Sequence, residues 1–179
     1  TGEMAIMTNI VPFESSNLPA YIKASNVSEL NQDLTSHASS GFPIMSIKGK
    51  LAVVTGASSG ICRAVAERLR DEGMRVIGVD INGAQLAEVS GIEHLVVDLS
   101  SDHGRAEVVK AGKGAHALIN GAALIRLKKI REFTTQDIRD IYAVNVEAPW
   151  YLMNHLSEAM NDGGSIVNLS SVSARLTVT

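Results

Sequence analysis

The chain has 179 residues, of which 45% are hydrophobic and 20% charged, and its net charge is −3, a balance typical of one soluble globular domain with no attraction to nucleic acid or to an acidic membrane. Its single cysteine excludes an intramolecular disulfide and favours a reducing, cytoplasmic setting, and its five scattered histidines predict no metal site. The first residues lack the features of a signal peptide, and no apolar run reaches the ~18 residues of a transmembrane helix.

Residues 1–46 differ in character from the rest of the chain. They are rich in serine and asparagine, contain Pro12, Pro19 and Pro43, and show no sustained period. This composition favours loop, an extended arm or disorder, with at most one short helix in residues 21–34. We therefore divide the chain into an N-terminal arm or fused segment, residues 1–46, and one domain, residues 47–179.

From residue 50 onward, short apolar runs alternate with helical patterns. The runs predict five buried strands, and the segments between them predict four helices. The strands are expected at residues 50–55, 75–81, 94–99, 116–121 and 165–171, and the helices at residues 61–73, 83–89, 100–112 and 134–163.

Two of these helices carry further signals. The first places Ile61, Val65 and Leu69 at helical spacing on one face and ends at Gly73. The last begins at Thr134 or Thr135, ends at Gly163, and contains Pro149, which is expected to bend it.

Buried strands that alternate with helices indicate βαβ units and a parallel sheet covered on both faces. Because the crossovers are right-handed, the expected fold is α/β: a doubly wound, Rossmann-like parallel sheet. We expect it to stop after the fifth strand and to follow an irregular N-terminal arm.

The first strand runs into the first helix through the segment "TGASSGI", residues 55–61. Gly56 allows a sharp turn, and Gly60 allows the backbone to approach a pyrophosphate that rests on the helix N-terminus. Two glycines alone are also compatible with an ordinary strand–helix turn. Cys62 stands where a third glycine would complete the nucleotide fingerprint.

The second strand ends at Asp80, 20 residues after Gly60. A carboxylate at this place can accept both hydroxyls of an adenosine ribose and would repel a 2′-phosphate. Ser58 and Ser59 occupy positions where a basic residue could hold that phosphate. The sequence therefore predicts NAD in preference to NADP, the alternative being that Asp80 is only a cap or turn residue.

Several motifs in order and spacing give the chain a resemblance to a known family. The segments "KGKLAVVTGASSGI", "VVDLS", "ALINGAAL", "YAVNV" and "GSIVNLSS" resemble those of the classical short-chain dehydrogenases/reductases over about residues 47–173, and residues 1–46 are unmatched. The resemblance implies a single-domain Rossmann fold, a dimer or tetramer, and hydride transfer between NAD(P) and a small-molecule alcohol or ketone.

The resemblance also assigns cofactor contacts. It places them in the glycine turn, at the adenine end and beside the fourth strand. The residues are Gly56, Ser58, Ser59, Gly60 and Ile61; Asp98 and Leu99; and Asn120, Gly121 and Ala122. Asp98 could alternatively be a helix cap. The family's Asn-Asn-Ala-Gly motif is altered, because Gly121 replaces the second asparagine and Ala123 the final glycine.

Two further residues match the family's catalytic positions. Asn145 corresponds to the helix asparagine that holds a water in a proton relay, and Ser171 to the serine that hydrogen-bonds the substrate oxygen. The alternatives are a buried hydrogen-bonding asparagine and a plain strand-end serine.

The family's remaining catalytic pair, Tyr-x-x-x-Lys, does not occur in the 179 residues. Tyr142 and Tyr151 precede the serine and cannot replace it, and the sequence ends at Thr179, eight residues after Ser171. One hypothesis is therefore a fragment or fusion of an NAD(P)-dependent oxidoreductase whose longer sequence carries the pair. The other is a non-catalytic nucleotide-binding or assembly module. On either hypothesis we expect no turnover by these 179 residues alone.

The missing remainder would leave the fifth strand as an open edge. It would also leave the apolar residues of the long helix, Ile141, Val144, Trp150 and Leu152, without cover. We expect a partner chain in a homo-oligomer, or the N-terminal arm, to shield them.

Cys62 is expected to pack as a small hydrophobic residue, displacing the helix slightly and weakening cofactor binding. A redox-sensing thiol is the alternative, because the helix N-terminus would lower its pKa, with Arg63 as the adjacent cation.

Overall fold

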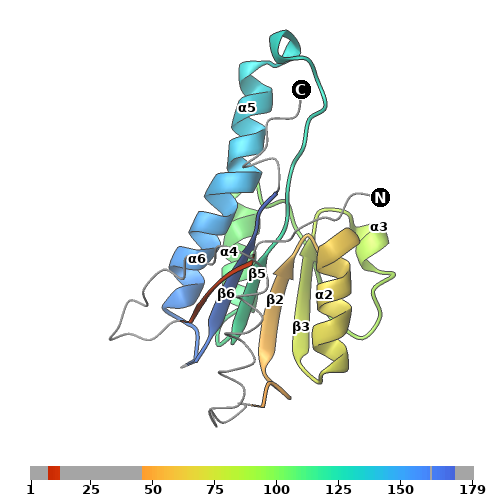
Figure 1. Ribbon diagram of the computed structural model, residues 1–179, viewed down its shortest axis with the longest axis vertical. Helices are drawn as coiled ribbons and strands as arrows, with labels where there is room; N and C mark the ends of the chain where they lie inside the picture. Colours follow the sequence, from red (N-terminus) through yellow and green to blue (C-terminus); the bar gives the residue numbers. More distant parts are fainter. Residues whose placement is uncertain (1–7, 13–45, 162, 172–179) are drawn as a thin grey trace, which may run out of the picture.

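The computed structural model describes residues 8–12, 46–161 and 163–171. Its sheet has the strand order β1–β6–β5–β2–β3–β4 (Figure 1). Strands β4, β3, β2, β5 and β6 are mutually parallel, which confirms the doubly wound, Rossmann-like sheet. The strands are β1 (Thr8–Pro12), β2 (Leu51–Thr55), β3 (Arg75–Asp80), β4 (Glu93–Val96), β5 (Ala117–Asn120) and β6 (Ser165–Leu169).

Helices cover both faces of this sheet. Along β2 the side chains alternate, so that Val53 belongs to one core cluster while Ala52 and Val54 belong to the other. The first cluster includes Leu152 and Leu156 of α6, and the second includes Cys62 of α2. The helical segments are α2 (Gly60–Asp71), α3 (Gly83–Leu86), α4 (Asp102–Ala111), η1 (Ile130–Glu132), α5 (Thr135–Tyr142), η2 (Ala143–Glu147) and α6 (Ala148–Ser157).

The buried face of α2 differs from the one expected. Cys62 and Ala66 are its buried residues, Val65 and Leu69 pack partly against the core, and Ile61 remains 39% exposed. The helix is rotated by about one residue from the predicted face because the small side chains of Cys62 and Ala66 allow its backbone to lie close to the sheet.

The predicted long helix begins at Thr134 as expected, but it is not one continuous α-helix. The π-helical segment η2 separates α5 from α6 and ends immediately before Ala148 and Pro149. Pro149 has no N–H to donate to the carbonyl of Asn145, so the α-helical hydrogen-bond pattern is interrupted at this point. The helix also ends at Ser157 rather than at Gly163.

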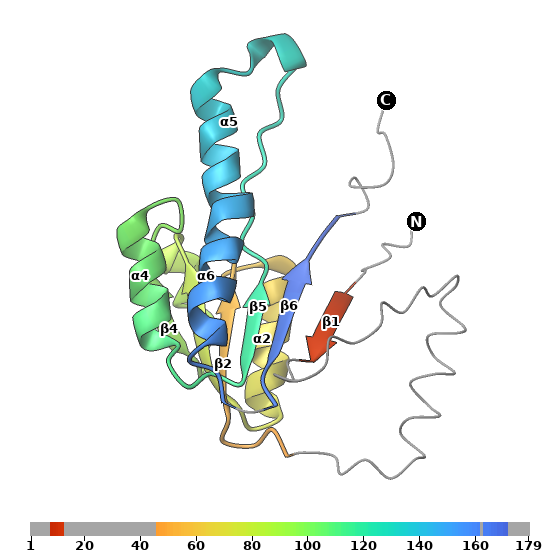
Figure 2. The same ribbon diagram turned by 90° about the vertical axis from the view of Figure 1, so that its left-hand side faces the viewer.

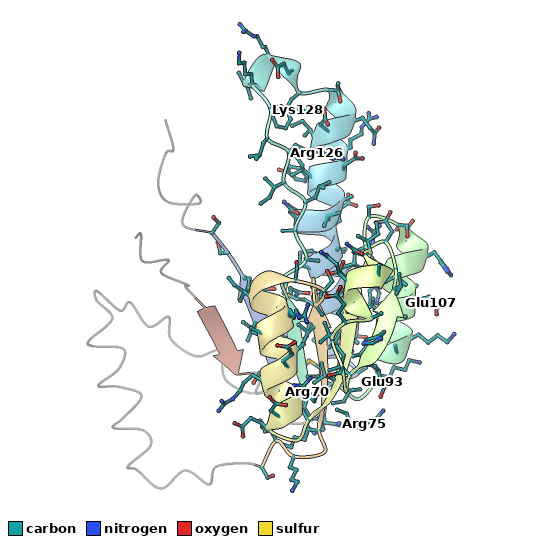
Figure 3. All side chains as sticks on the ribbon, turned by 90° about the vertical axis from the view of Figure 1, so that its right-hand side faces the viewer. Arg70, Arg75, Glu93, Glu107, Arg126 and Lys128 are labelled. Carbon is teal, nitrogen blue, oxygen red and sulfur yellow. The ribbon has the colours of Figure 1, made fainter. Side chains whose placement is uncertain are left out.

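Helix α5 and the loop before it project beyond the carboxyl ends of the strands (Figure 1). Thr134 and Asp137 form a capping box at the start of α5. The Nζ atom of Lys128 donates to both carboxylate oxygens of Asp137 at 2.8 and 2.9 Å, and Lys128 and Arg126 lie beside α5 (Figure 3). These bonds, first that from Lys128 and then those from Thr134, hold the pKa of Asp137 well below its usual range.

The edge of β6 is not open. Strand β1 pairs with β6 in antiparallel register, from Thr8 opposite Leu169 to Pro12 opposite Ser165, and lies alongside it in Figure 2. Part of the N-terminal arm therefore satisfies the backbone groups of the fifth parallel strand. The helix predicted for residues 21–34 lies outside the described residues. Among the residues that are described, the helices are too short or too polar to cross a membrane.

Candidate cofactor site

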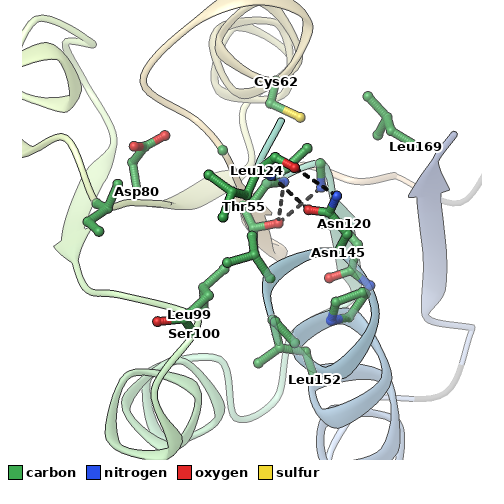
Figure 4. Close-up of a pocket in the computed structure, with 18 of the residues that line it drawn as sticks. Thr55, Cys62, Asp80, Leu99, Ser100, Asn120, Leu124, Asn145, Leu152 and Leu169 are labelled. Carbon is green, nitrogen blue, oxygen red and sulfur yellow. Dashed lines mark hydrogen bonds between the residues drawn. The ribbon is translucent and has the colours of Figure 1, made fainter. Parts of the chain in front are cut away.

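A cleft of about 1340 Å³ opens at the carboxyl ends of the strands, beside the ends of β2 and β5. The connections after these strands leave toward opposite faces of the sheet, so this is the topological switch point where open α/β sheets bind ligands. Figure 4 shows Asp80 on one side of Thr55, with Asn120 and Asn145 on the other. Every residue predicted to contact cofactor or substrate lines the cleft except Gly60, whose neighbours Ser59 and Ile61 do.

Both glycines of the predicted turn have left-handed backbone conformations. The φ angle is 73° at Gly56 and 56° at Gly60, which other residues adopt only with strain. A Cβ on Gly56 would lie 2.9 Å from both the N of Ala122 and the O of Gly121, whereas one on Gly60 would meet nothing within 4 Å. Gly56 is therefore required by the packing of the turn on the end of β5, and Gly60 opens the space before the first amides of α2.

Thr55 is a site residue that sequence reasoning missed. Its side chain is buried, and its Oγ1 accepts hydrogen bonds from the N–H groups of Gly121 at 3.0 Å and Ala122 at 3.1 Å while donating to the carbonyl of Ile119. It thus fixes the glycine turn against the end of β5. A polar residue ending a buried apolar strand was the available signal.

Asp80 is half-buried and supports two turns at once. Its Oδ2 accepts the N–H of Ser58 at 3.0 Å and its Oδ1 accepts the N–H of Asn82 at 2.9 Å. A carboxylate has about four acceptor positions, so two remain for hydroxyl donors in the cleft. The turn role and the ribose-binding role are therefore compatible.

The loop at Asp98 and Leu99, which follows β4, lines the cleft. Asp98 is exposed, and its Oδ1 accepts the N–H of Ser100 at 2.8 Å. The N-terminal cap of α4 is Ser101, whose Oγ accepts the N–H of Gly104. Asp98 is therefore a turn residue rather than the cap, and its remaining acceptor positions are available to a ligand.

Asn120 closes the bottom of the cleft at the end of β5. Its Nδ2 donates to the Oδ1 of Asn168 in β6 at 2.9 Å, and its own Oδ1 is buried with no hydrogen-bond partner in the described part of the chain. A buried acceptor of this kind is costly unless a donor reaches it.

Cys62 and Gly121, two departures from the family pattern, contact each other. A Cβ built on Gly121 would overlap the Sγ of Cys62. Burial, followed by the negative charge of Asp80, raises the pKa of the Cys62 thiol to about 11. The expected lowering of this pKa by the helix N-terminus is therefore wrong. Arg63 is directed elsewhere, with its Nε 3.1 Å from the Oε1 of Glu67.

Asn145 lies in the π-helical segment η2. Its Oδ1 accepts the N–H of Leu124 at 2.7 Å and its Nδ2 donates to the Leu124 carbonyl at 3.0 Å. The side chain thus holds the irregular segment that follows β5, and Figure 4 shows Asn145 beside Leu124. Ser171, two residues after the end of β6, is exposed and lines the cleft. Within the described residues there is no cluster of His, Cys, Asp and Glu that could hold a metal ion.

Comparison with known proteins agrees with this geometry. The model of the short chain dehydrogenase family matches residues 50–179. Sorbitol dehydrogenase of Cereibacter sphaeroides is 35% identical over 143 residues, which cover 73% of this chain and 56% of that protein. D-threitol dehydrogenase of Mycolicibacterium smegmatis is 32% identical, covering 72% of this chain and 55% of that protein.

A solved structure is similar as well. The L-sorbose reductase of Gluconobacter frateurii, complexed with NADPH and L-sorbose, superimposes with a TM-score of 0.59 at 30% identity, covering 64% of this chain and 49% of the other. The chain thus spans about half the length of the relatives that it matches.

Proposed function

Because the chain belongs to the short-chain dehydrogenase family, we propose that its cleft binds a nicotinamide dinucleotide and forms the cofactor half of an oxidoreductase acting on alcohols or ketones. The observation that carries the proposal is the glycine turn at the start of α2, with left-handed φ angles at Gly56 and Gly60, beside the carboxylate of Asp80 in the same cleft. Helix N-termini bind phosphate, and a strand-end carboxylate binds ribose hydroxyls.

The described residues fit such a ligand in the following way. The amides at the start of α2 would hold the pyrophosphate, Asp80 the adenosine ribose, and Asp98 the amino group of the adenine. The buried Oδ1 of Asn120, which has no partner within the described residues, would gain a donor near the nicotinamide end. The bound dinucleotide supplies the hydride acceptor or donor. Ser171 would hydrogen-bond the substrate oxygen, and Asn145 would position a water.

The substrate class is proposed from the relatives. Sorbitol and D-threitol dehydrogenases, by their names, act on polyols, and the similar L-sorbose reductase binds a keto-sugar. We infer that a polyhydroxylated alcohol or its ketone is the substrate of the protein to which these residues belong. NAD is the proposed cofactor, on the strength of Asp80.

The binding proposal is tested with two matched glycine variants. Gly60 and Gly49 both have positive φ angles, 56° and 78°, and a Cβ on either would meet nothing within 4 Å. Gly60→Ala and Gly49→Ala therefore carry similar backbone strain, but only Gly60 belongs to the turn at the start of α2 that is expected to hold the pyrophosphate. In fluorescence titration with NADH, we expect Gly60→Ala to weaken binding about tenfold and Gly49→Ala to leave it unchanged. No binding by the unsubstituted chain, or equal losses in both variants, would contradict the proposal.

Assembly is proposed from the outer face of α5, η2 and α6. Leu152 is fully buried within the chain, contrary to expectation, whereas Trp150 is 61% exposed. Trp150 is the last of a row of exposed apolar side chains at four-residue spacing, the others being Ile138, Tyr142 and Val146. An exposed row of this kind is typical of a protein interface.

We expect sedimentation velocity to show an oligomer of the 179-residue chain and Trp150→Glu to shift it toward monomer. Leu127→Glu is the matched control, since Leu127 is 95% exposed but lies in the projecting loop. A compact monomer before substitution would disprove the assembly.

A further inference from the structure

A buried arginine lies directly behind the loop that carries Asp98. Arg105 of α4 is only 7% exposed. Its Nη1 donates to the carbonyl oxygens of Leu99 at 3.0 Å and Ser100 at 3.1 Å, and its Nη2 donates to the carboxylate of Asp102. The guanidinium therefore holds two consecutive carbonyl groups on the far side of the loop from the cleft.

The same guanidinium reaches the long helix. Its Nη1 lies 3.8 Å from the Oε2 of Glu147 in η2, and its central carbon lies 5.7 Å from the centroid of the Tyr151 ring in α6. Arg105 thus joins three parts of the fold: helix α4, the loop at Leu99 and Ser100, and the helix that carries Asn145.

Stability alone does not explain this arginine. A guanidinium cannot lose its proton, and its burial is costly unless hydrogen bonds replace the lost water. Its Nε is buried without a partner among the described residues, and the carboxylate side chains of Asp102 and Glu147 are 96% and 60% exposed. An apolar side chain could fill this place at lower desolvation cost, but it could not hold the carbonyl groups of Leu99 and Ser100.

The loop has other attachments besides Arg105. The N–H of Val97 donates to the carbonyl of Asp80 in β3 at 3.1 Å, and the Leu99 side chain packs in the core. Others come from α4. The hydroxyl group of Ser101 donates a hydrogen bond to the carbonyl of Asp98 at 2.8 Å, and a Cβ on Gly104 would overlap that same carbonyl. These contacts fix the start of the turn, and Arg105 fixes the next two peptide groups. The position of the Asp98 carboxylate depends on both.

We propose that Arg105 is a positioning residue that sets the Asp98 loop for recognition of the adenine base. This inference rests on the dinucleotide binding proposed above. Without the guanidinium, the carbonyl groups of Leu99 and Ser100 turn toward water, and the Asp98 carboxylate loses its alignment with the amino group of the base.

The test compares NAD with nicotinamide hypoxanthine dinucleotide, which carries an oxygen in place of that amino group. We expect the unsubstituted chain to bind NAD about tenfold more tightly, because Asp98 accepts a hydrogen bond from the amino group. Arg105→Met keeps the apolar stem, and it should reduce this ratio to about twofold or less. Arg105→Lys keeps the charge without the forked geometry and should give an intermediate ratio.

Val108→Ala is the control for a purely structural effect. Val108 lies in the same helix, is fully buried and contacts the core, so this variant should lower the melting temperature without changing the ratio. If Arg105→Met does not fold, the ratio measured for Arg105→Lys decides.

Each outcome has a separate meaning. A chain that binds neither dinucleotide refutes the proposed function, and the inference with it. A chain that binds both equally, or Arg105 variants that keep the original ratio, refute the role of Arg105 and leave the proposed function standing.

Discussion

Gly121→Asn is expected to disrupt the cofactor site unless Cys62 is changed with it. A Cβ at position 121 would overlap the Sγ of Cys62 and lie 3.3 Å from the carbonyl oxygen of Thr55. The sulfur must then move with the start of α2, where the pyrophosphate is expected. Overpacking of this kind costs about 1–3 kcal/mol in stability. We expect NADH affinity to fall by one to two orders of magnitude, roughly the same free energy.

The double variant Cys62→Gly/Gly121→Asn should recover both stability and NADH affinity, because removal of the thiol frees the space that the asparagine requires. Cys62→Gly alone should hold or improve NADH affinity, despite a helix cost of roughly 1 kcal/mol. Thermal unfolding and NADH titration of the four proteins complete a double-mutant cycle. A double variant as impaired as Gly121→Asn would show that the two positions are independent, and a tenfold loss in Cys62→Gly would give the thiol a positive role.

We propose that the chain binds NAD about a hundredfold more tightly than NADP, and that Asp80→Ala narrows this difference to less than tenfold. The variant loses the hydrogen bonds that the ribose hydroxyls of NAD donate to the carboxylate, each worth roughly 1.5–3 kcal/mol. It also loses the repulsion between this carboxylate and the 2′-phosphate of NADP. Asp80→Asn separates the two effects, since an amide oxygen can still accept from the Ser58 or Asn82 amides but carries no charge.

Asp140→Asn is the matched control for charge. Asp140 also lines the cleft, but its carboxylate lies near Arg126 at the other end, 3.7 Å from the Nη2 atom. Calorimetric titration with both cofactors should leave its preference unchanged. Equal affinity of the unsubstituted chain for NAD and NADP would contradict the proposal that Asp80 binds the hydroxyls of the adenosine ribose.

The parallel strands and the position of the cleft could be predicted because they depend on local patterns. Apolar runs such as residues 51–55 mark buried strands, and Gly56, Gly60 and Asp80 mark strand ends that a doubly wound sheet brings to one edge. Strand β1 could not be predicted, because residues 8–12 are too short for a period and their pairing depends on β6.

Features that depend on contacts between distant residues were also missed. Cys62 and Gly121 were recognised separately as departures, but only the fold shows that the side chain of one occupies the space vacated by the other. No local pattern distinguishes Arg105 from the other charged residues of its helix, yet it is buried and donates to the carbonyl groups of Leu99 and Ser100. The division of the long helix was signalled by Pro149, but the π-helical form and the early end at Ser157 were not.

The pairing of β1 with β6 has a consequence for the order in which the chain folds during synthesis. Thr8 is paired with Leu169, 161 residues further on, so β1 leaves the ribosome long before β6, and its hydrogen bonds to β6 can form only after β6 has been synthesised. Closing so long a loop is entropically costly and slow relative to the local βαβ units. The four strands from β2 to β5 can assemble first, and the pairing of β1 with β6 is a late, non-local step.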